Sequence, residues 1–453
     1  MSSYPPSPSP HSPVPKKSHD LFPAPHWRDL WAALLFYFHL AVFAIITVYC
    51  FVNSKHELAD AEWLRNINLG SDYWTLIVLQ VMGSVIIGLA VSYFSLNMMS
   101  KNAEQLMNLA MISAAVLFFL YAVLIISINI FMGIIMFLGG ALSLIWYLMV
   151  RSRIPFSAII LRMVIDCTRE YPSVYFVMAM SIFVTIIYSV VFMICQVVIA
   201  KAYEFLGEEL FKVVAIYSVF SMFWTTQVIV NVVHTAIAGV FATYYFTDGS
   251  NQLVTQATSQ SVKRALSYSF GSVCFGSLIV ALIQTLRFVL RSAHNGRNNL
   301  AKAIIDCVLD IIEGLVRYFN YYAYTQIAIY GKSFVEAASD TWELIKRRGL
   351  EAIINDDLIG ACCGFICVFA MVLSMAFSTG VSVFIYNVPF FTALIVSILF
   401  SLIALMITAS TMKVITAGST SIFVCLAEDP RALQRNNPTL YGTITTKYGA
   451  FLA

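Results

Sequence analysis

The sequence predicts an all-α polytopic membrane protein with about ten transmembrane helices and both termini in the cytoplasm. Hydrophobic residues make up 60% of the 453 residues and charged residues only 11%, less than half the share that is usual in soluble domains. Apolar runs of 18 or more residues recur along the chain, and each can cross a hydrocarbon core of ~30 Å. The alternating ten-residue segments of a membrane β-barrel are absent from the sequence.

The ten predicted spans differ in length and in the segments that join them. The third and fourth are separated only by Ser127 and Ile128, which predicts a tight hairpin. The sixth is longer than a crossing requires, so we expect it to be tilted, protruding or broken around Gly239. The spans cover approximately residues 28–52, 73–96, 106–126, 129–150, 172–199, 213–246, 266–287, 303–329, 358–384 and 389–412.

The segments at both ends of the predicted transmembrane domain, residues 27–427, are expected to lie in the cytoplasm. Residues 1–26 are rich in Pro and Ser, cannot build a core, and are expected to be a disordered tail. Residues 428–453 form the second cytoplasmic tail.

Residues 333–349 predict an amphipathic helix on the cytoplasmic face, ending at Gly349. The helix packs on the bundle, lies against lipid, or does both. Its predicted apolar stripe consists of Phe334, Ala338, Trp342 and Ile345.

The orientation follows from the distribution of Lys and Arg, which favours the cytoplasmic side. With the N-terminus inside, the cytoplasmic segments hold 18 basic residues and the outer segments eight. The outer segment 287–302 is an exception, because Arg287, Arg291, Arg297 and Lys302 have no acid nearby in that segment. Either these residues pack against protein, or the seventh and eighth spans are misplaced.

The eighth span concentrates the ionisable groups of the membrane domain. Asp306, Asp310, Glu313 and Arg317 are spaced by four, three and four residues, which places them on one helical stripe. A charge at the bilayer centre costs roughly 2.5–3.5 kcal/mol, so these groups are expected to face the bundle or a wet cavity. Glu313 and Arg317 are expected to pair. The stripe is either a path for a cation or an ion pair that fixes the helix in the bundle.

The sixth span combines aromatic and polar side chains. Tyr217, Trp224 and Asn231 are seven residues apart and lie close to one helical face. An aromatic ring attracts a desolvated quaternary ammonium group by about 2 kcal/mol, so these residues are candidates for an organic-cation site, although helix packing explains most aromatic residues equally well. His234 could carry a coupled proton or be a neutral buried histidine.

Small residues in the seventh span point to close helix contacts. Gly271, Ser272, Gly276 and Ser277 form small-xxx-small steps, which let neighbouring helices approach.

Several other classes of function are not supported by the sequence. The net charge of +3 is small, which disfavours a nucleic-acid partner. The nine cysteines lack zinc-type spacing with histidine, so no metal, cofactor or catalytic residue is expected. No G-x-x-x-x-G-K-[ST] motif occurs, so ATP is not the expected energy source.

Five blocks of the sequence resemble the choline transporter-like family. They are YFNYYAYTQIAIYGKSF (318–334), RSRI (151–154), FW (223–224) followed by AGVFATYYF (238–246), GSVCFGSLIVALIQTLR (271–287) and SIFVCLAED (421–429). The loop 53–72 is shorter than in animal members, and residues 336–358 are more similar to the plant and fungal branches.

The resemblance implies a ten-helix carrier for choline or an ethanolamine-like cation, in the plasma membrane or an organelle, with protons as possible coupling ions. The leading hypothesis is a secondary carrier that works by alternating access. It places substrate among Trp224, Tyr217 and Asn231, balanced by Glu313, with His234, Arg317 and Asp310 along a polar path. Two alternatives remain open: a channel or lipid-handling protein, and a membrane enzyme of headgroup metabolism.

Overall fold

The computed structural model describes residues 26–53, 71–247, 256–293 and 299–452, and in these ranges every regular element is a helix. The predicted disordered tail falls outside the described residues except for its last residue, His26. Eight helical stretches in the described ranges are long and apolar enough to cross a membrane. The prediction of an all-α polytopic membrane protein is therefore confirmed.

The helices occur in the following order. They are α1 (Leu30–Asn53), α3 (Ser71–Ile126), α4 (Ile130–Val150), the 3-10 turn η2 (Arg151–Arg153), α5 (Ile154–Glu170), α6 (Ser173–Lys201), α7 (Tyr203–Leu206), α8 (Glu208–Thr247), α9 (Ala257–Leu266), α10 (Phe270–Ala293), α11 (Asn299–Tyr330), α12 (Phe334–Phe384), α13 (Phe390–Glu428), α14 (Pro430–Asn436) and α15 (Pro438–Leu452).

The second and third predicted spans both lie in α3, which is kinked at Asn102 (φ −128°, ψ 39°). The eighth predicted span is α11, whose 32 residues extend over about 48 Å. The ten predicted spans thus correspond to the eight apolar stretches, with the stretch 74–126 divided at Asn102 and α11 added. The predicted hairpin is also present, since Asn129 caps α4 through a 3.1 Å hydrogen bond from Met132 N.

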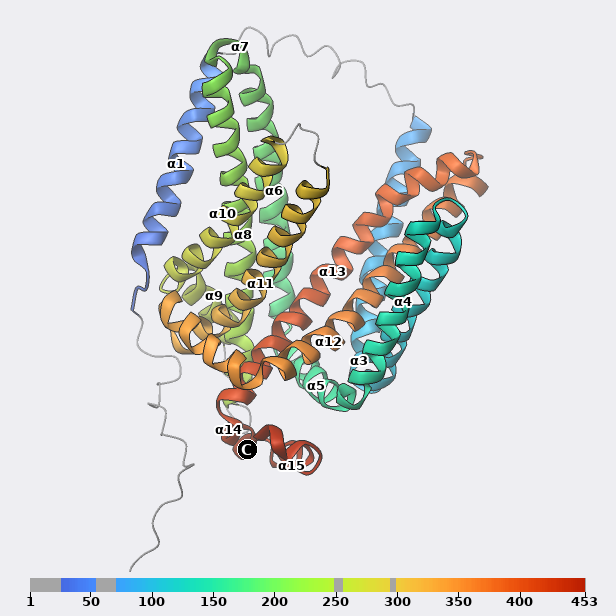
Figure 1. Ribbon diagram of the computed structural model, residues 1–453, viewed down its shortest axis with the longest axis vertical. Helices are drawn as coiled ribbons and strands as arrows, with labels where there is room; N and C mark the ends of the chain where they lie inside the picture. Colours follow the sequence, from blue (N-terminus) through green and yellow to red (C-terminus); the bar gives the residue numbers. More distant parts are fainter. Residues whose placement is uncertain (1–25, 54–70, 248–255, 294–298, 453) are drawn as a thin grey trace, which may run out of the picture.

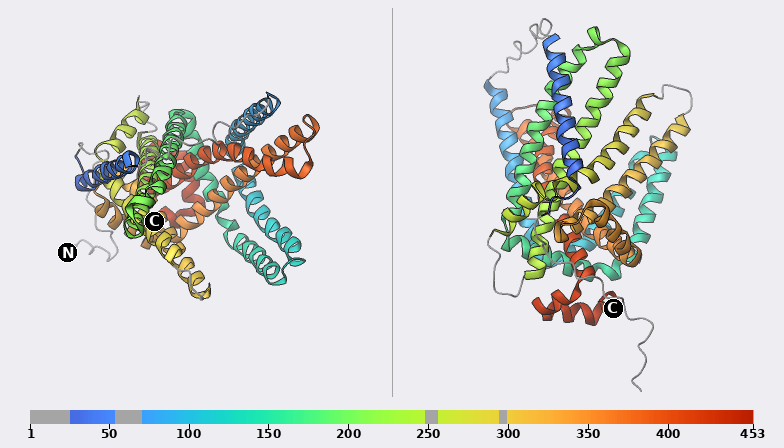
Figure 2. Two further views of the ribbon diagram at one scale, coloured as in Figure 1. Left: turned by 90° about the horizontal axis from the view of Figure 1, so that it is seen from above. Right: turned by 90° about the vertical axis from the view of Figure 1, so that its left-hand side faces the viewer.

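The helices form two groups that diverge from a common end (Figure 1). One group contains α1, α6, α8, α10 and α11, and the other contains α3, α4, α12 and α13. Viewed from above, the two groups occupy opposite halves of the molecule (Figure 2). We call them the α8 group and the α13 group. The end where they meet, which also carries α5, α9 and α14, is called the lower end.

Both ends of the described chain lie at the lower end (Figure 1). Before α1, Arg28 N donates to Tyr268 O at 3.1 Å in the turn between α9 and α10. The predicted C-terminal tail is helical and packs on the bundle: Tyr245 Oη donates to Asp429 O at 3.0 Å, and Asn436 Nδ2 donates to Tyr245 O at 2.9 Å. Gln326 Nε2 donates to Glu428 Oε1 at 3.2 Å, so the last turn of α13 is joined to α11.

α8 is one continuous helix of 40 residues, about 60 Å long. Of the alternatives for this span, a break at Gly239 is therefore wrong. Gly239 instead allows a close approach, because a Cβ at this position would lie 2.9 Å from Ser261 Oγ in α9. The backbone of α8 stays helical at Gly239, and the absence of a side chain there allows α9 to pack closely.

α12 begins as predicted but does not end at Gly349. Ser333 and Glu336 form a capping box at its start, with Glu336 N to Ser333 Oγ at 3.4 Å and Ser333 N to Glu336 Oε2 at 3.1 Å. The helix then continues to Phe384. The predicted apolar stripe is shifted by one residue after Phe334, since the buried positions are Phe334, Ala337, Thr341 and Leu344 and Trp342 is exposed.

The glycines of α10 lie at close contacts: Gly276 meets α11, as predicted for helix packing, whereas Gly271 meets the non-helical backbone just before α1. A Cβ at Gly271 would be 2.3 Å from the backbone oxygen of Asp29, and one at Gly276 would be 2.5 Å from Tyr324 Oη. No side chain larger than hydrogen fits at Gly271, because a backbone atom cannot move aside as a side-chain tip can.

Candidate functional site

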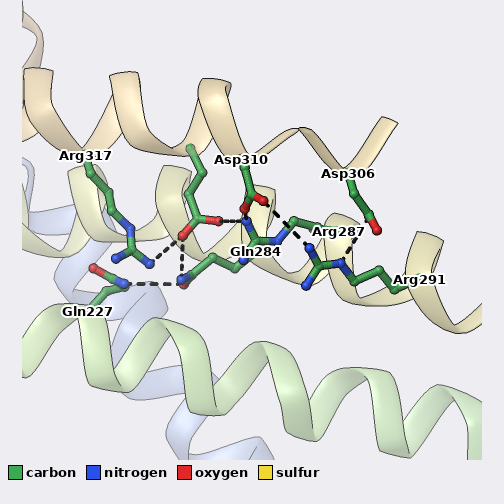
Figure 3. Close-up of polar contacts among 8 residues, drawn as sticks. Gln227, Gln284, Arg287, Arg291, Asp306, Asp310 and Arg317 are labelled. Carbon is green, nitrogen blue, oxygen red and sulfur yellow. Dashed lines mark hydrogen bonds and ion pairs between the residues drawn. The ribbon is translucent and has the colours of Figure 1, made fainter. Parts of the chain in front are cut away.

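The acidic stripe of α11 faces arginines of α10 and forms one ion network (Figure 3). Glu313 pairs with Arg287 at 2.9 Å and with Arg317 on its own helix. Gln284 Nε2 also donates to Glu313 Oε1 at 2.9 Å, and Gln227 Nε2 donates to Gln284 Oε1 at 3.3 Å. The predicted Glu313–Arg317 pair is present. The Glu313 carboxylate is buried and accepts hydrogen bonds or ion pairs from side chains of α10 and α11.

The same network explains the basic exception in the orientation count. Arg287 pairs with Asp310 as well as with Glu313. Arg291 contacts two acids: its Nε lies 3.1 Å from Asp306 Oδ1, and its Nη2 lies 3.8 Å from Asp310 Oδ2. Arg287 and Arg291 therefore pack against protein acids, which was one of the two alternatives. Arg297 and the side chain of Lys302 lie outside the described residues.

The network is neutral as a set, with three acids and three arginines. These contacts join α10 to α11 and fit the interpretation of an ion pair that fixes the helix. A role of Glu313, Arg317 and Asp310 in transport stays a prediction. Of these three, Arg317 lines a cavity, which is described next.

Two adjoining cavities lie beside α8, one between the two helix groups and one mainly within the α8 group. The Asp356 cavity has a volume of about 230 Å³ and is lined by α6, α8 and α11 on one side and by α12 and α13 on the other. The Gln284 cavity, of about 730 Å³, is lined mainly by α6, α8, α10 and α11. Val230, Tyr321 and Lys413 line both cavities, which makes them neighbours.

Asp356 supplies a carboxylate to the first cavity, and this residue was not among those predicted for the site. Its Oδ2 accepts a 2.6 Å hydrogen bond from Tyr322 Oη, and Tyr318 Oη donates to Tyr322 Oη at 3.2 Å. Tyr318 and Tyr321 also line the cavity. The adjacent Asp357 contacts Trp146 Nε1 at 2.7 Å instead. The sequence feature that could have indicated Asp356 is the pair of acids, Asp356 and Asp357, immediately before the ninth predicted span.

Two of the predicted site residues lie on the cavities. His234 lines the Asp356 cavity, and its Nε2 donates to Tyr321 O at 3.1 Å. Asn231 lines the Gln284 cavity, and its Nδ2 donates to Ser277 Oγ at 2.9 Å and to Tyr324 Oη at 3.3 Å. Both side chains therefore have partners that fix their orientation beside the open volume.

Trp224 and Tyr217 lie elsewhere, where α8 meets α1 and α10. The Trp224 ring stacks on His39 at 4.4 Å between centroids, and its Nε1 donates to Cys274 O at 3.1 Å. Tyr217 Oη donates to His39 O at 2.8 Å. Neither residue lines the two cavities. The residues predicted to bind substrate are thus divided: Trp224 and Tyr217 lie in a helix contact, and Asn231 lies on a cavity wall. Direct contact of the Trp224 and Tyr217 rings with substrate stays a prediction.

Metal binding has no support in the described ranges, where no three His, Cys, Asp or Glu side chains stand close enough to share an ion. The arrangement instead offers an acid, aromatic rings and amides around open volume, which are the groups that hold an organic cation without a metal.

Comparison with known proteins gives a consistent result. A family model described as plasma-membrane choline transporter matches residues 134–431. A CTL-like protein of Dictyostelium discoideum is 30% identical over 94% of this chain and 76% of its own length. The protein PNS1 of Eremothecium gossypii is 33% identical over 70% of this chain, and the match spans 62% of that relative.

The matched region contains both cavities and the α10–α11 network, and a further PNS1 protein, from Gibberella zeae, is 28% identical over 94% of the chain. The family model covers well over half of the chain, from α4 to α14. The chain therefore belongs to the choline transporter-like family.

Proposed function

We propose that this protein is a secondary carrier that moves choline or a related small organic cation across the plasma membrane by alternating access. The observation that carries the proposal is the Asp356 cavity, which brings one carboxylate and the rings of Tyr318 and Tyr321 together between the two helix groups. Membership of a choline transporter-like family supports a cationic substrate.

The proposed site uses Asp356 as the counter-charge and the tyrosine rings as the wall for the ammonium group. A quaternary ammonium has no N–H to donate, so its binding depends on charge and on the negative faces of aromatic rings. His234 is placed beside the same volume by its bond to Tyr321 O and is our proposed proton-accepting group.

Lys413 lies on the wall that the two cavities share and is the competing cation. A substrate cation must displace its ammonium group from the neighbourhood of Asp356 or bind against its charge. Removal of Lys413 should therefore favour substrate binding, whereas removal of Asp356 should oppose it. These opposite signs are specific to a cation substrate.

Glu313, Arg317 and Asp310 have a supporting role in this proposal. Gln284 lines the larger cavity and is oriented by Glu313, so the ion network fixes one polar wall of the path. We also propose that the lower end faces the cytoplasm, because the basic segments predicted to be inside include η2 and α9, which lie there. The membrane potential then favours entry of one positive charge by about 2.3 kcal/mol per 100 mV.

The test is uptake of radiolabelled choline into proteoliposomes that contain the purified full chain. Wild-type uptake should saturate, be competed by unlabelled choline, and increase with an inside-negative potassium diffusion potential. Asp356→Asn should abolish it, and Lys413→Gln should lower the KM. Asp166→Asn is the matched control, since Asp166 is an exposed acid that pairs with Arg169 in α5.

Three outcomes contradict the proposal. Wild-type uptake no greater than that of protein-free liposomes removes choline transport. Uptake that stays linear with concentration supports a channel. Movement of labelled phospholipid between leaflets, without saturable choline uptake, supports the lipid-handling alternative.

A further inference from the structure

A third cavity lies at the lower end, apart from the proposed substrate path. It has a volume of about 340 Å³ and is enclosed by α9, by α8 near Thr235 and Gly239, and by the end of α11. It shares no lining residue with the Asp356 cavity or the Gln284 cavity. We call it the α9 cavity.

The lining of the α9 cavity is basic. Arg28, Lys263 and Arg264 contribute three positive charges and His26 a further titratable group, and no Asp or Glu occurs among the described residues that line it. In a chain with only 11% charged residues, this concentration of one sign around a single volume is unusual. A cavity with such a field attracts anions.

The guanidinium groups are held in place by protein contacts. Arg28 Nε donates to Gly331 O at 3.2 Å, where Gly331 (φ 59°) ends α11, and Arg264 Nη2 donates to Ser261 Oγ at 3.0 Å. Gly239 provides the space for this pair, because a Cβ there would lie 2.9 Å from Ser261 Oγ, the hydroxyl that accepts from Arg264. The site is thus preorganised by backbone and hydroxyl contacts, which limits the entropy lost when a ligand binds.

Two acids close to Arg28 in the sequence or in space, Asp29 and Glu336, also take part in other contacts. Asp29 Oδ2 accepts from Ser272 Oγ and Phe334 N, each at 2.7 Å. Glu336 Oε2 accepts from Ser333 N at 3.1 Å in the capping box, although its charge also acts on Arg28. Burial lowers the pKa of Arg264, so its charged form is desolvated and gains from an anion placed beside it.

The position of the cavity matches the depth of lipid headgroups. Trp27 and Trp31 are 59% and 50% exposed, and the Trp27 ring packs edge-on against Tyr268 at 5.3 Å between centroids. Exposed tryptophans at the end of a transmembrane bundle are typical of the membrane–water boundary. Phosphorylated headgroups of cytoplasmic leaflets are bound by clusters of Lys and Arg at this depth.

We propose that the α9 cavity is a binding site for a phosphate group, either on a phosphorylated lipid headgroup or as free phosphate. Arg28 and Arg264 supply planar guanidinium groups that match the geometry of phosphate oxygens, and Lys263 adds a point charge. The volume exceeds that of the anion alone and accommodates the group that carries it. This proposal does not depend on choline transport.

The experiment measures binding to the full chain in phosphatidylcholine nanodiscs with two probes. One is radiolabelled inorganic phosphate in equilibrium dialysis, and the other is fluorescent phosphatidylinositol 4-phosphate incorporated into the disc. We expect Arg264→Gln to weaken binding of at least one probe by about tenfold, because one charge-assisted hydrogen bond is lost. Lys263→Gln should weaken it to a similar extent without disturbing the Arg264–Ser261 bond.

Lys346→Gln is the matched control, since Lys346 is an exposed lysine of α12 that lies over the Trp342 ring at 5.2 Å and outside the cavity. Binding of the lipid without binding of inorganic phosphate assigns the site to headgroups, and binding of inorganic phosphate without the lipid assigns it to free phosphate. The proposal is overturned if neither probe binds the wild-type chain. It is also overturned if the Lys263 and Arg264 variants, verified as folded by size-exclusion chromatography, bind like the control.

Discussion

Glu313→Gln isolates the charge at the centre of the α10–α11 network while keeping the shape of the side chain. Glu313 is 7% exposed and pairs with Arg287 and Arg317, whose side chains are 23% and 42% exposed. Glutamine can still contact Gln284, so the substitution removes the negative charge and little else. Two guanidinium groups then lose a shared acid.

The expected cost follows from the exposure of each partner. Removing one member of a buried ion pair costs about 3–5 kcal/mol, but an exposed pair contributes at most about 1 kcal/mol. Arg317 is partly exposed, so its pair with Glu313 lies between these two cases, and Arg287 keeps Asp310 as a second acid. We therefore expect the free energy of unfolding to fall by about 1.5–3 kcal/mol, the range for a hydrogen bond to a charged group.

The assay is SDS-titration unfolding of the purified protein, with uptake per folded molecule as a second readout. Glu343→Gln is the matched control, because Glu343 and Arg347 form the same i,i+4 pair at 57% and 58% exposure. Its effect should stay below about 0.5 kcal/mol. Glu313→Gln combined with Arg287→Gln should cost less than the two single variants added together, since both charges are then absent.

Equal unfolding free energies for Glu313→Gln and Glu343→Gln would refute the reasoning, as would strict additivity in the double variant. Uptake separates structure from transport. We expect Glu313→Gln to reduce uptake per folded molecule strongly, because Gln284 on the cavity wall loses its charged acceptor. Unchanged uptake would restrict Glu313 to a structural role.

Three further predictions concern packing, capping and the aromatic contact. Gly271→Ala should prevent accumulation of folded protein, because the new Cβ would collide with backbone atoms. Gly314 has open space around it, so Gly314→Ala should stabilise α11 by roughly 0.5–1 kcal/mol. Fluorescence-detected size-exclusion chromatography after heating compares the two variants. Ser333→Ala should lower stability by about 1 kcal/mol in the same assay, since the capping box is lost, and an unchanged melting profile would contradict this. Trp224→Ala should weaken choline affinity more than Trp224→Phe, which keeps a ring; equal KM values for the two variants would argue against any role for the ring in binding.

The sequence was informative where structure depends on local spacing or on the solvent. Membrane spans, the hairpin before Asn129 and the Glu313–Arg317 pair each follow from hydrophobic runs or from i,i+4 geometry. The small residues at Gly271 and Gly276 likewise indicated close contacts correctly. These features involve neighbours along the chain or the general cost of burying charge.

The sequence could not provide the register between helices. Local spacing patterns do not indicate that Arg287 faces Glu313. They also do not indicate that Asp356 faces a cavity whereas Asp357 faces Trp146. Trp224 was selected for its chemistry, but its neighbours come from α1 and α10, which are distant in sequence.

Two errors in α12 have a simple energetic origin. A glycine inside a helix costs only about 1 kcal/mol, so Gly349 does not stop a helix whose flanking residues continue it. The buried stripe passes through Thr341 rather than Trp342, because a small hydroxyl side chain fits against the bundle and a large indole can remain at the surface.

α13 is a rod of about 58 Å that runs down to the lower end of the molecule, where α14 follows (Figure 1). Thr416, Ser419 and Thr420 form part of the Asp356 cavity wall, and two turns later the same helix is tied to Gln326 and leads into α14. A stiff helix transmits displacement along its axis, so a force applied to α14 and α15 from the aqueous side reaches the cavity wall. Under the proposed function, a nanobody or fusion domain attached to α14 or α15 is therefore expected to alter transport, so an affinity tag is better placed away from these two helices.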